Sequence, residues 1–254
     1  MTPLERINII RKWILEYVET MDKPANCLVV GISGGVDSAV VSTICAMTGM
    51  KTLVASMPIS QRPEHHDLSI KHKNWITTKY SNCFGVEIDL THTFLSFENQ
   101  MVDMKFKDEM GLANSRARMR MMCLYQLSAS TSGIVVGTGN KIEDFGVGFY
   151  TKYGDGGVDI SPIADCTKTE IWAMAKELNI LEEIQAAEPT DGLWNDGRND
   201  TDQLGMSYSQ IEYLMNNPSE PDYQKYLLIR KKNLHKMKSI PVCKFDGKTN
   251  LAND

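Results

Sequence analysis

The stretch Val30–Val40, VGISGGVDSAV, decides the fold, because it joins an apolar strand to an apolar helix through a turn of small residues. The run CLVVGI at 27–32 has the Val/Ile content of a buried strand, and apolar residues at helical spacing resume at Val36. The glycines between them lack the Cβ atoms that would keep a ligand away from the backbone, and Ser33 and Ser38 add hydroxyl groups. Successive N–H groups in such a turn, followed by the positive end of a helix, form an anion cradle. We expect the anion to be phosphate.

The turn differs from two common phosphate-binding loops. A Walker A loop carries a Lys-Ser/Thr pair after its last glycine, whereas Val36-Asp37-Ser38 follows here, and the glycine spacing is not the G-x-G-x-x-G of a dinucleotide fingerprint. A carboxylate beside phosphate is repulsive unless a divalent cation lies between them. Asp37 therefore predicts Mg²⁺ at this turn. A simpler role for Asp37, capping the helix, is compatible with metal binding.

Short apolar runs alternate with helical patterns in the first half of the chain. Strands are predicted at 27–32, 52–57, 84–89 and 133–138, and helices at 36–47, within 63–80, and at 91–107 and 114–128. This alternation predicts right-handed crossovers and an α/β fold with a doubly wound, Rossmann-like parallel sheet of about five strands flanked by helices. Ligands bind beyond the carboxyl ends of the strands in such folds. With 254 residues and 42% hydrophobic content, we expect one domain over 1–254.

The second half contains two long polar loops and further helices. A Gly- and Asp-rich loop runs to Asp159, a second loop covers 188–205, and helices are predicted at 167–178, 207–215 and 222–236. At the other end of the chain, Thr2, Pro3 and Glu5 predict a helix start. The apolar stripe of that helix needs either its own sheet or a second subunit to pack on, and we favour the second subunit.

Charge and composition exclude several functions. A formal net charge of -5 gives no general attraction to nucleic acid, so we expect no nucleic-acid partner. The sequence has no apolar run long enough to cross a membrane and begins with a charged, amphipathic segment, which predicts a cytoplasmic protein without membrane contact. The six cysteines form no C-x-x-C pair, so we expect them to be reduced structural residues.

The turn SGGVDS (33–38) resembles the pyrophosphate-binding motif of the N-type ATP pyrophosphatases, which have an adenine nucleotide alpha hydrolase-like fold. Further motifs at 114–121, 137–171, 187–208 and 235–236 are similar to those of the NAD synthetases. The resemblance implies a ligase that uses ATP and ammonia to amidate deamido-NAD through an acyl adenylate, releasing NAD, AMP and diphosphate. A dimer and a Mg²⁺ cofactor are implied as well.

Site residues are implied by the same resemblance. Asp37 and Lys168 would be catalytic, and Asp37 and Glu143 would bind the metal; the segment after Glu143 is longer than the common family spacing, so Asp144 is an alternative ligand. The residues that would contact ATP are Gly31, Ile32, Ser33, Gly34, Gly35, Val36, Asp37, Ser38, Thr138, Lys168 and Thr190. Those that would contact deamido-NAD, some across a homodimer, are Arg118, Lys152, Asp159, His235 and Lys236.

Some of these residues are also compatible with a purely structural role. Glu143 could be a solvated loop carboxylate, and His235 lies in a basic run typical of an exposed helix face. Lys168 begins a helix, where a cation is unfavourable, so an anion is expected beside it. The loop 188–205 is expected to order only over bound ATP, as a lid.

Alternative functions are open as well. The chain could amidate nicotinate mononucleotide or another carboxylate, or bind ATP as a non-catalytic regulator. The length leaves no room for a glutamine amidotransferase domain, so free ammonia is the expected nitrogen donor.

Overall fold

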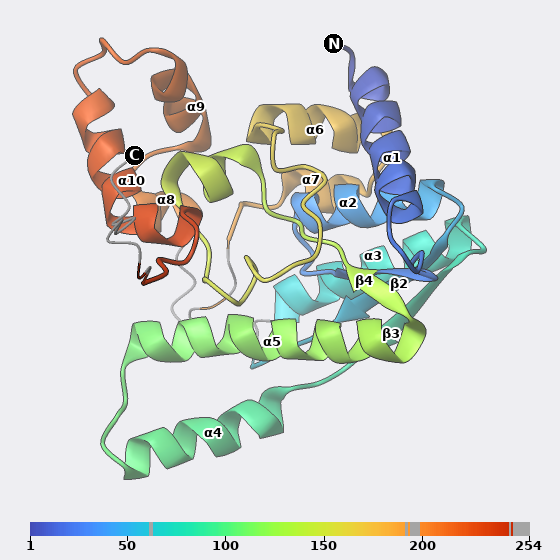
Figure 1. Cartoon of the computed structure of the whole chain (residues 1–254), viewed down its shortest axis with the longest axis horizontal. Coiled ribbons are helices and arrows are strands. Elements are labelled where there is room, and N and C mark those ends of the chain that lie inside the picture. The colour runs from blue at the N-terminus through green and yellow to red at the C-terminus, as the bar shows by residue number, and fades with distance from the viewer. Residues whose placement is uncertain (61–62, 191–192, 194–198, 244, 246–254) are drawn as a thin grey trace.

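The computed structural model describes residues 1–60, 63–190, 193, 199–243 and 245, and it confirms a parallel α/β fold. The strands are β1 (Cys27–Gly31), β2 (Lys51–Ser56), β3 (Cys83–Glu87) and β4 (Gly133–Val135), in the order β3-β2-β1-β4 (Figure 1). About five strands were expected, but within the described ranges the sheet has four. A single parallel bridge between Val136 and Ile160 occupies the next position, and one bridge is too short to form a strand.

β1 lies inside the sheet and pairs in parallel with both neighbours, so Val29 faces Leu53 on one side and Val135 on the other. From β1 the chain proceeds outward to β2 and β3, then returns to place β4 on the opposite side. Loops leaving the carboxyl ends of β1 and β4 therefore run in opposite directions. Such a switch point opens a crevice where α/β proteins bind ligands.

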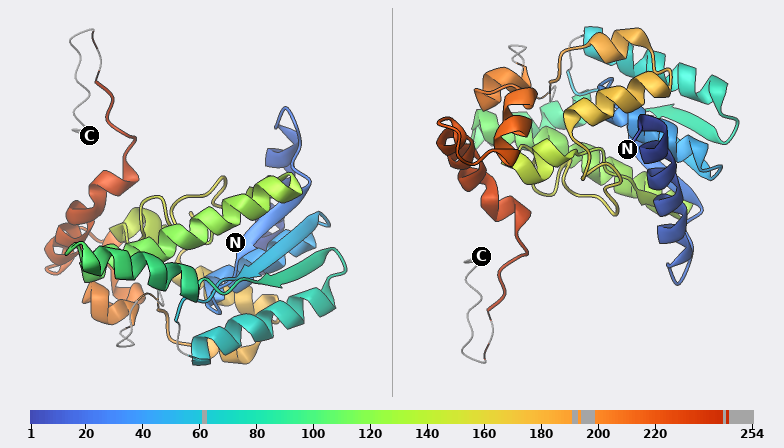
Figure 2. Two further views of the ribbon diagram at one scale, coloured as in Figure 1. Left: turned by 90° about the horizontal axis from the view of Figure 1, so that it is seen from below. Right: turned by 90° about the horizontal axis from the view of Figure 1, so that it is seen from above.

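Helices cover both faces of the sheet (Figure 2). On one face, α2 (Val36–Met47) packs with α3 (Pro63–Lys79) and α6 (Lys168–Glu177), and α7 (Glu182–Ala186) joins α2 and α6. On the other face, α5 (Glu109–Thr131) crosses β1 and β4, and α4 (Thr91–Asp103) lies against α5. α5 starts earlier than expected because the Asp108 side chain caps it by accepting the N–H of Gly111 at 2.6 Å.

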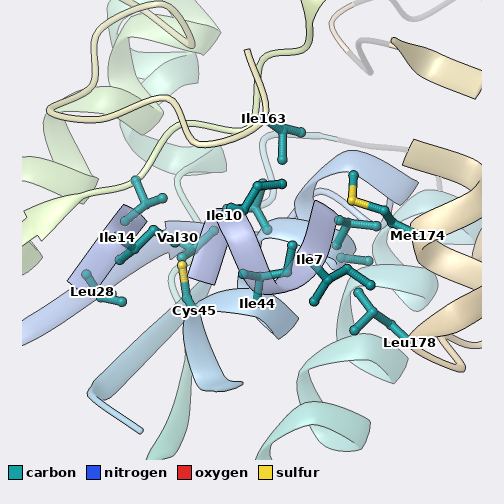
Figure 3. Close-up of a cluster of buried hydrophobic side chains, with 14 of the residues drawn as sticks. Ile7, Ile10, Ile14, Leu28, Val30, Ile44, Cys45, Ile163, Met174 and Leu178 are labelled. Atoms are coloured by element: carbon teal, nitrogen blue, oxygen red, sulfur yellow. The ribbon is translucent and has the colours of Figure 1, made fainter. Parts of the chain in front are cut away.

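The N-terminal helix α1 (Pro3–Glu19) begins as predicted. The Thr2 hydroxyl and the Glu5 carboxylate each accept a backbone N–H of the other, which forms a capping box. The expectation that α1 packs on a second subunit rather than on its own chain is wrong for the buried part of its apolar stripe, Ile7, Ile10, Ile14 and Val18, whereas Leu4 and Tyr17 are exposed. Ile7 and Ile14 are fully buried against α2 and α6 of the same chain (Figure 3).

The second half of the chain forms a separate apolar cluster at one end of the molecule. It consists of the π-helix η1 (Ile142–Val147), α8 (Asp200–Leu204), α9 (Tyr208–Asn216) and α10 (Tyr223–Met237). Only the part of the predicted loop at Ile142–Val147 is helical, because Ile142 and Val147 are buried against α9 and α10.

The loop expected at 188–205 is described only in part. Its end, α8, buries Asp200 and Leu204, so the expectation that the whole loop orders only over bound ATP is wrong there. The remainder of the lid prediction concerns 191–192 and 194–198, which lie outside the described residues. No helix in the described part of the chain is long and apolar enough to cross a membrane.

Candidate active site

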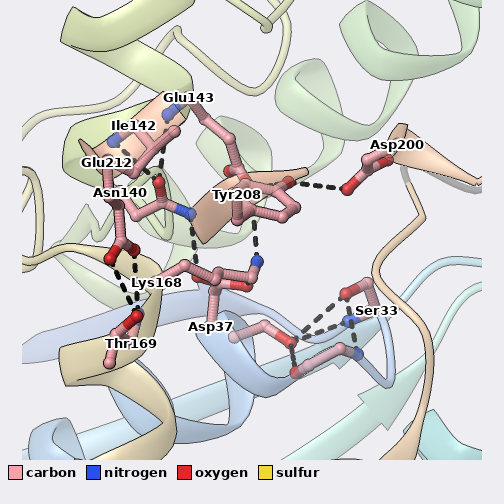
Figure 4. Close-up of polar contacts among 12 residues, drawn as sticks. Ser33, Asp37, Asn140, Ile142, Glu143, Lys168, Thr169, Asp200, Tyr208 and Glu212 are labelled. Carbon is pink, nitrogen blue, oxygen red and sulfur yellow. Dashed lines mark hydrogen bonds and ion pairs between the residues drawn. The ribbon is translucent and has the colours of Figure 1, made fainter. Parts of the chain in front are cut away.

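The predicted anion cradle forms between β1 and α2. Gly34 has φ +90°, a left-handed conformation that favours glycine, and Gly35 is the N-cap of α2. The Ser38 hydroxyl accepts the N–H of Ser33 at 3.2 Å and donates to the carbonyl of Gly35 at 3.0 Å. The Ser33 hydroxyl accepts the Gly35 N–H at 3.2 Å (Figure 4). The two serines thus hold the turn in shape before any ligand binds.

A cavity of about 270 Å³ opens beside this turn, at the carboxyl ends of β1, β2 and β4. Every residue predicted to contact ATP lines it: Gly31, Ile32, Ser33, Gly34, Gly35, Val36, Asp37, Ser38, Thr138, Lys168 and Thr190. The two candidate metal ligands, Glu143 and Asp144, line it as well. Segments that are distant in sequence therefore meet at the predicted edge of the sheet.

Lys168 lies at the centre of the charged part of this cavity. It is the first residue of α6, after the capping box of Thr167 and Glu170, and its side chain is almost fully buried. Its Nζ lies 2.5 Å from Oδ2 of Asp37 and 3.2 Å from Oε1 of Glu143. Burial lowers the pKa of Lys168, but the charges of Asp37 and Glu143 raise it more, so the net pKa lies above its usual value and the amine stays charged. The anions expected beside this lysine are thus two carboxylates.

Asn140 connects the two carboxylates, and sequence reasoning missed it. It is fully buried; its Nδ2 donates to Oδ1 of Asp37 at 3.0 Å, and its Oδ1 accepts the N–H groups of Ile142 and Glu143, each at 3.0 Å. It therefore caps the start of η1 while orienting Asp37. Its place within the motif at 137–171 was the only signal in the sequence.

Tyr208 and Asp200 complete the polar network and were also missed. The Tyr208 hydroxyl lies 2.6 Å from Oε1 of Glu143 and 2.7 Å from Oδ2 of Asp200. The Lys168 amine lies 4.7 Å from the centroid of the same ring, which is a cation–π contact. Burial, followed by the charges of Glu143 and Asp200, raises the pKa of Tyr208, so the phenol is neutral.

The charge balance of the cavity fits a divalent cation. Among the described residues, six carboxylates line it, those of Asp37, Glu143, Asp144, Asp155, Glu188 and Asp200, against two cationic side chains, Arg120 and Lys168. Burial first, and then the charges of Glu143, Asp155 and Asp37, raise the pKa of Asp144 to about 7. Carboxylate oxygens are the ligands that Mg²⁺ prefers. Among the described residues, however, no group of three or more His, Cys, Asp or Glu side chains is arranged to hold a metal, so phosphate oxygens and water would have to supply the other ligands.

The residues predicted to contact the dinucleotide are not part of this cavity. Arg118 Nε donates to the carbonyl of Lys152 at 3.2 Å, and the Lys236 amine donates to the carbonyl of Tyr150 at 2.6 Å. His235 is exposed on α10.

Asp159 is occupied by contacts within the fold. It accepts the hydroxyl of Tyr125 at 3.1 Å and the N–H of Val135 at 2.7 Å. The structure therefore brings Arg118 and Lys152 together but does not unite all the predicted dinucleotide contacts at one place.

The fold and this cavity define a doubly wound α/β protein with a charged crevice at the switch point of its sheet. The chain belongs to the NAD synthase family, whose model matches residues 6–250. An NH(3)-dependent NAD(+) synthetase of Carboxydothermus hydrogenoformans is 34% identical over 240 residues, which cover 93% of this chain and 96% of that protein.

Solved structures resemble the chain over most of its length. The structure of an NMN synthetase from Francisella tularensis matches with a TM-score of 0.86 and 26% identity, covering 96% of this chain and 100% of that one. An NH3-dependent NAD synthetase from Campylobacter jejuni matches with a TM-score of 0.76, and at 24% identity it supports the fold alone.

Proposed function

We propose that this chain is an ammonia-dependent NAD synthetase, a ligase that joins ammonia to the nicotinate carboxylate of deamido-NAD and splits ATP into AMP and diphosphate. Family membership and curated relatives over nearly the whole chain support this function. The observation that carries it is the contact of Lys168 with both Asp37 and Glu143 beside the anion cradle.

The chemistry accounts for the need to bring these groups together. A carboxylate is a poor electrophile, so ammonia cannot displace oxide from it. The carboxylate oxygen must first attack the α-phosphorus of ATP, which releases diphosphate and leaves an acyl adenylate; ammonia then attacks the acyl carbon, and AMP departs. Both steps bring anions together and build charge on phosphate oxygens, which fixed N–H groups and cations stabilise.

Each residue in the cavity has a corresponding role in this proposal. The Gly31–Ser38 turn binds the phosphates. Because the N–H groups of Ile32, Ser33 and Gly35 are bonded within the fold, those at the start of α2 bind the phosphate oxygens, with Thr138 and Thr190 as further ATP contacts. The Lys168 amine neutralises charge on the phosphates. Asp37 and Glu143 hold Mg²⁺, which supplies Lewis-acid polarisation of the phosphates when bound. We favour Glu143 over Asp144 because Glu143 shares Lys168 with Asp37.

The test is product analysis by mass spectrometry after mixing the protein with deamido-NAD, ATP, Mg²⁺ and ammonium. We expect NAD, AMP and diphosphate in equal amounts, and Asp37→Ala should reduce the rate by at least about 100-fold. Asp165→Ala is the matched control, because that carboxylate is exposed and its ion pair among the described residues is with the Lys141 amine. Formation of ADP and phosphate would contradict the proposal.

The likeness to the Francisella tularensis NMN synthetase is the reason to assay a second substrate. The curated relatives favour deamido-NAD, so we expect a higher kcat/KM with deamido-NAD than with nicotinate mononucleotide. A preference for the mononucleotide would reassign the substrate without changing the adenylation chemistry. Binding of ATP with no product from either compound would favour a non-catalytic regulator.

The remaining parts of the proposal concern assembly and partners. The dinucleotide contacts Arg118, Lys152, Asp159, His235 and Lys236 lie outside the ATP cavity, which is in keeping with a site shared across a homodimer. We also propose that the chain forms a single domain, that it acts in the cytoplasm and that its nitrogen donor is free ammonia. Sedimentation equilibrium of the full chain measures the dimer directly.

A further inference from the structure

Tyr208 is an uncharged side chain placed among charged ones. It is the first residue of α9, where the capping box of Ser207 and Gln210 fixes the helix start. Its ring is buried in the apolar cluster formed by η1, α8, α9 and α10, and only 5% of the residue is exposed. Its hydroxyl group reaches the polar network between Glu143 and Asp200 (Figure 4), and its ring face contacts the Lys168 amine.

The Tyr208 hydroxyl lies between two carboxylates from different segments. Glu143 comes from η1 and Asp200 from α8, and both approach the same phenol oxygen within hydrogen-bond distance. Asp200 in turn donates its N–H to the carbonyl of Pro189, which precedes Thr190 at the cavity wall. One hydroxyl group therefore connects the candidate metal ligand Glu143 to the segment that carries Thr190.

The contacts of Glu143 indicate what this connection does. Tyr208 and Lys168 both bind Oε1 of Glu143. Within the described residues, Oε2 accepts no hydrogen bond, so it is the oxygen left for a cation. Without the hydroxyl group, Glu143 and Asp200 would repel each other across the space it occupied, and Lys168 alone would hold Oε1.

We propose that Tyr208 is a positioning residue for the reaction: its hydroxyl group donates its one proton to Oε1 of Glu143, which holds that oxygen beside Lys168, separates it from Asp200 and leaves Oε2 of Glu143 for Mg²⁺. The inference rests on the proposed function. The ring of Tyr208 also forms the cation–π contact with the Lys168 amine. The hydroxyl group and the ring therefore contribute separately to the arrangement of the site.

Tyr208→Phe tests the hydroxyl group alone, because phenylalanine keeps the ring, its packing and the cation–π contact. A hydrogen bond to a charged group is strong, so we expect kcat for NAD formation to fall about tenfold or more. The KM for ATP should change less than about threefold, since the anion cradle is intact. The Mg²⁺ concentration needed for half-maximal rate should rise.

A binding measurement provides a readout that does not require turnover. Mn²⁺ binding to the full chain can be followed by electron paramagnetic resonance in the presence of α,β-methylene-ATP, which cannot be cleaved between its α and β phosphorus atoms. We expect the Kd for Mn²⁺ to rise at least about threefold in Tyr208→Phe, as for a residue that orients a ligand to the metal.

Tyr226→Phe is the matched control, because Tyr226 is equally buried in the same apolar cluster but does not line the cavity. It should leave kcat and the Mn²⁺ affinity unchanged. The proposal is overturned if Tyr208→Phe retains wild-type kcat and Mn²⁺ affinity. It is equally overturned if both variants lose activity only in step with a lower Tm, because Tyr208 would then be a core residue only.

The two proposals fail in different ways. If the wild-type chain forms no NAD, the proposed function fails, while the Mn²⁺ measurement still decides the role of Tyr208. If the wild-type chain forms NAD and Tyr208→Phe behaves as wild type, only the role of Tyr208 is refuted.

Discussion

Asn140 donates a hydrogen bond to Asp37 across 103 residues of sequence, while its amide oxygen accepts the N–H of Glu143. One buried side chain therefore orients both candidate metal ligands, Asp37 through its carboxylate and Glu143 through the helix start that carries it. This arrangement allows the two functions of Asn140 to be separated by mutation.

We expect Asn140→Ala to lower the free energy of unfolding by about 2 kcal/mol, because the start of η1 loses its cap, and to reduce NAD formation strongly. Asn140→Ser keeps an oxygen for the helix start but is too short to reach Asp37. It should recover most of the stability and little of the activity. Urea denaturation and steady-state kinetics measure the two effects, and full activity in Asn140→Ser would refute the need for the bond to Asp37.

The buried Lys168 amine neutralises two carboxylates, so Lys168→Met should destabilise the protein. Removing one partner of a buried ion pair lowers the free energy of unfolding by about 3 kcal/mol or more, and NAD formation should be lost. Because the two carboxylates would then lack a cation, added Mg²⁺ should recover part of the stability in a thermal denaturation experiment. Lys141→Met, which removes an exposed ion pair with Asp165, should cost less than about 0.5 kcal/mol. No recovery by Mg²⁺ would argue against metal binding at Asp37 and Glu143.

Gly34 has a left-handed conformation in the anion cradle, and Gly34→Ala should strain it by about 1 kcal/mol. We expect the Kd for ATP, measured by calorimetry, to rise about tenfold as the turn distorts. Gly49→Ala is the control, because Gly49 has φ +81°, has no atom within 4 Å of an added Cβ and lies outside the cavity. It should cost similar stability and leave ATP binding unchanged; equal losses of binding in both variants would contradict a role specific to the turn.

His72 should make the protein sensitive to acid. It is buried between α2 and α3, its Nε2 lies 2.8 Å from the Ser42 hydroxyl, and burial lowers its pKa from 6.5 to about 4. The unfolded chain therefore binds a proton between pH 6.5 and 4 that the folded chain does not, so stability is lost as the pH falls through this range.

His72→Gln removes this titration, although it lowers stability at pH 7. We expect the variant to lose less stability than the wild type between pH 6.5 and 4, by at most about 3 kcal/mol, in urea denaturation at each pH. His92→Gln, at an exposed position on α4, serves as the control. Parallel stability curves for wild type and His72→Gln would show that His72 does not titrate in this range.

Local patterns in the sequence predicted the parts of the fold that depend on local interactions. Glycine and serine positions in 30–40 predicted the cradle, and the alternation of apolar runs with helical spacing predicted a parallel sheet with its site at the carboxyl ends. The capping box of α1 followed from Thr2 and Glu5. The sequence did not predict the surface on which α1 packs, because an apolar stripe on a helix does not identify the surface that it covers.

Contacts between segments that are distant in the chain could not be predicted from such local patterns. Asn140, Asp200 and Tyr208 lie in segments predicted as loops or helix starts, and nothing in their spacing indicates that they approach Asp37 or Glu143. The predicted number of strands was too high by one, because the backbone pairs at the fifth position only through the single bridge between Val136 and Ile160. Irregular backbone such as η1 has no periodic signature in sequence.

The ion pair between Asp37 and Lys168 joins groups 131 residues apart, on opposite sides of the switch between β1 and β4. A nascent chain that has folded only its β1–β3 half possesses the glycine turn but neither its lysine nor its second carboxylate. We therefore expect productive nucleotide binding to require that α6 has docked. ATP bound at this site would stabilise only chains in which both halves are in place, and it would shift the folding equilibrium toward them.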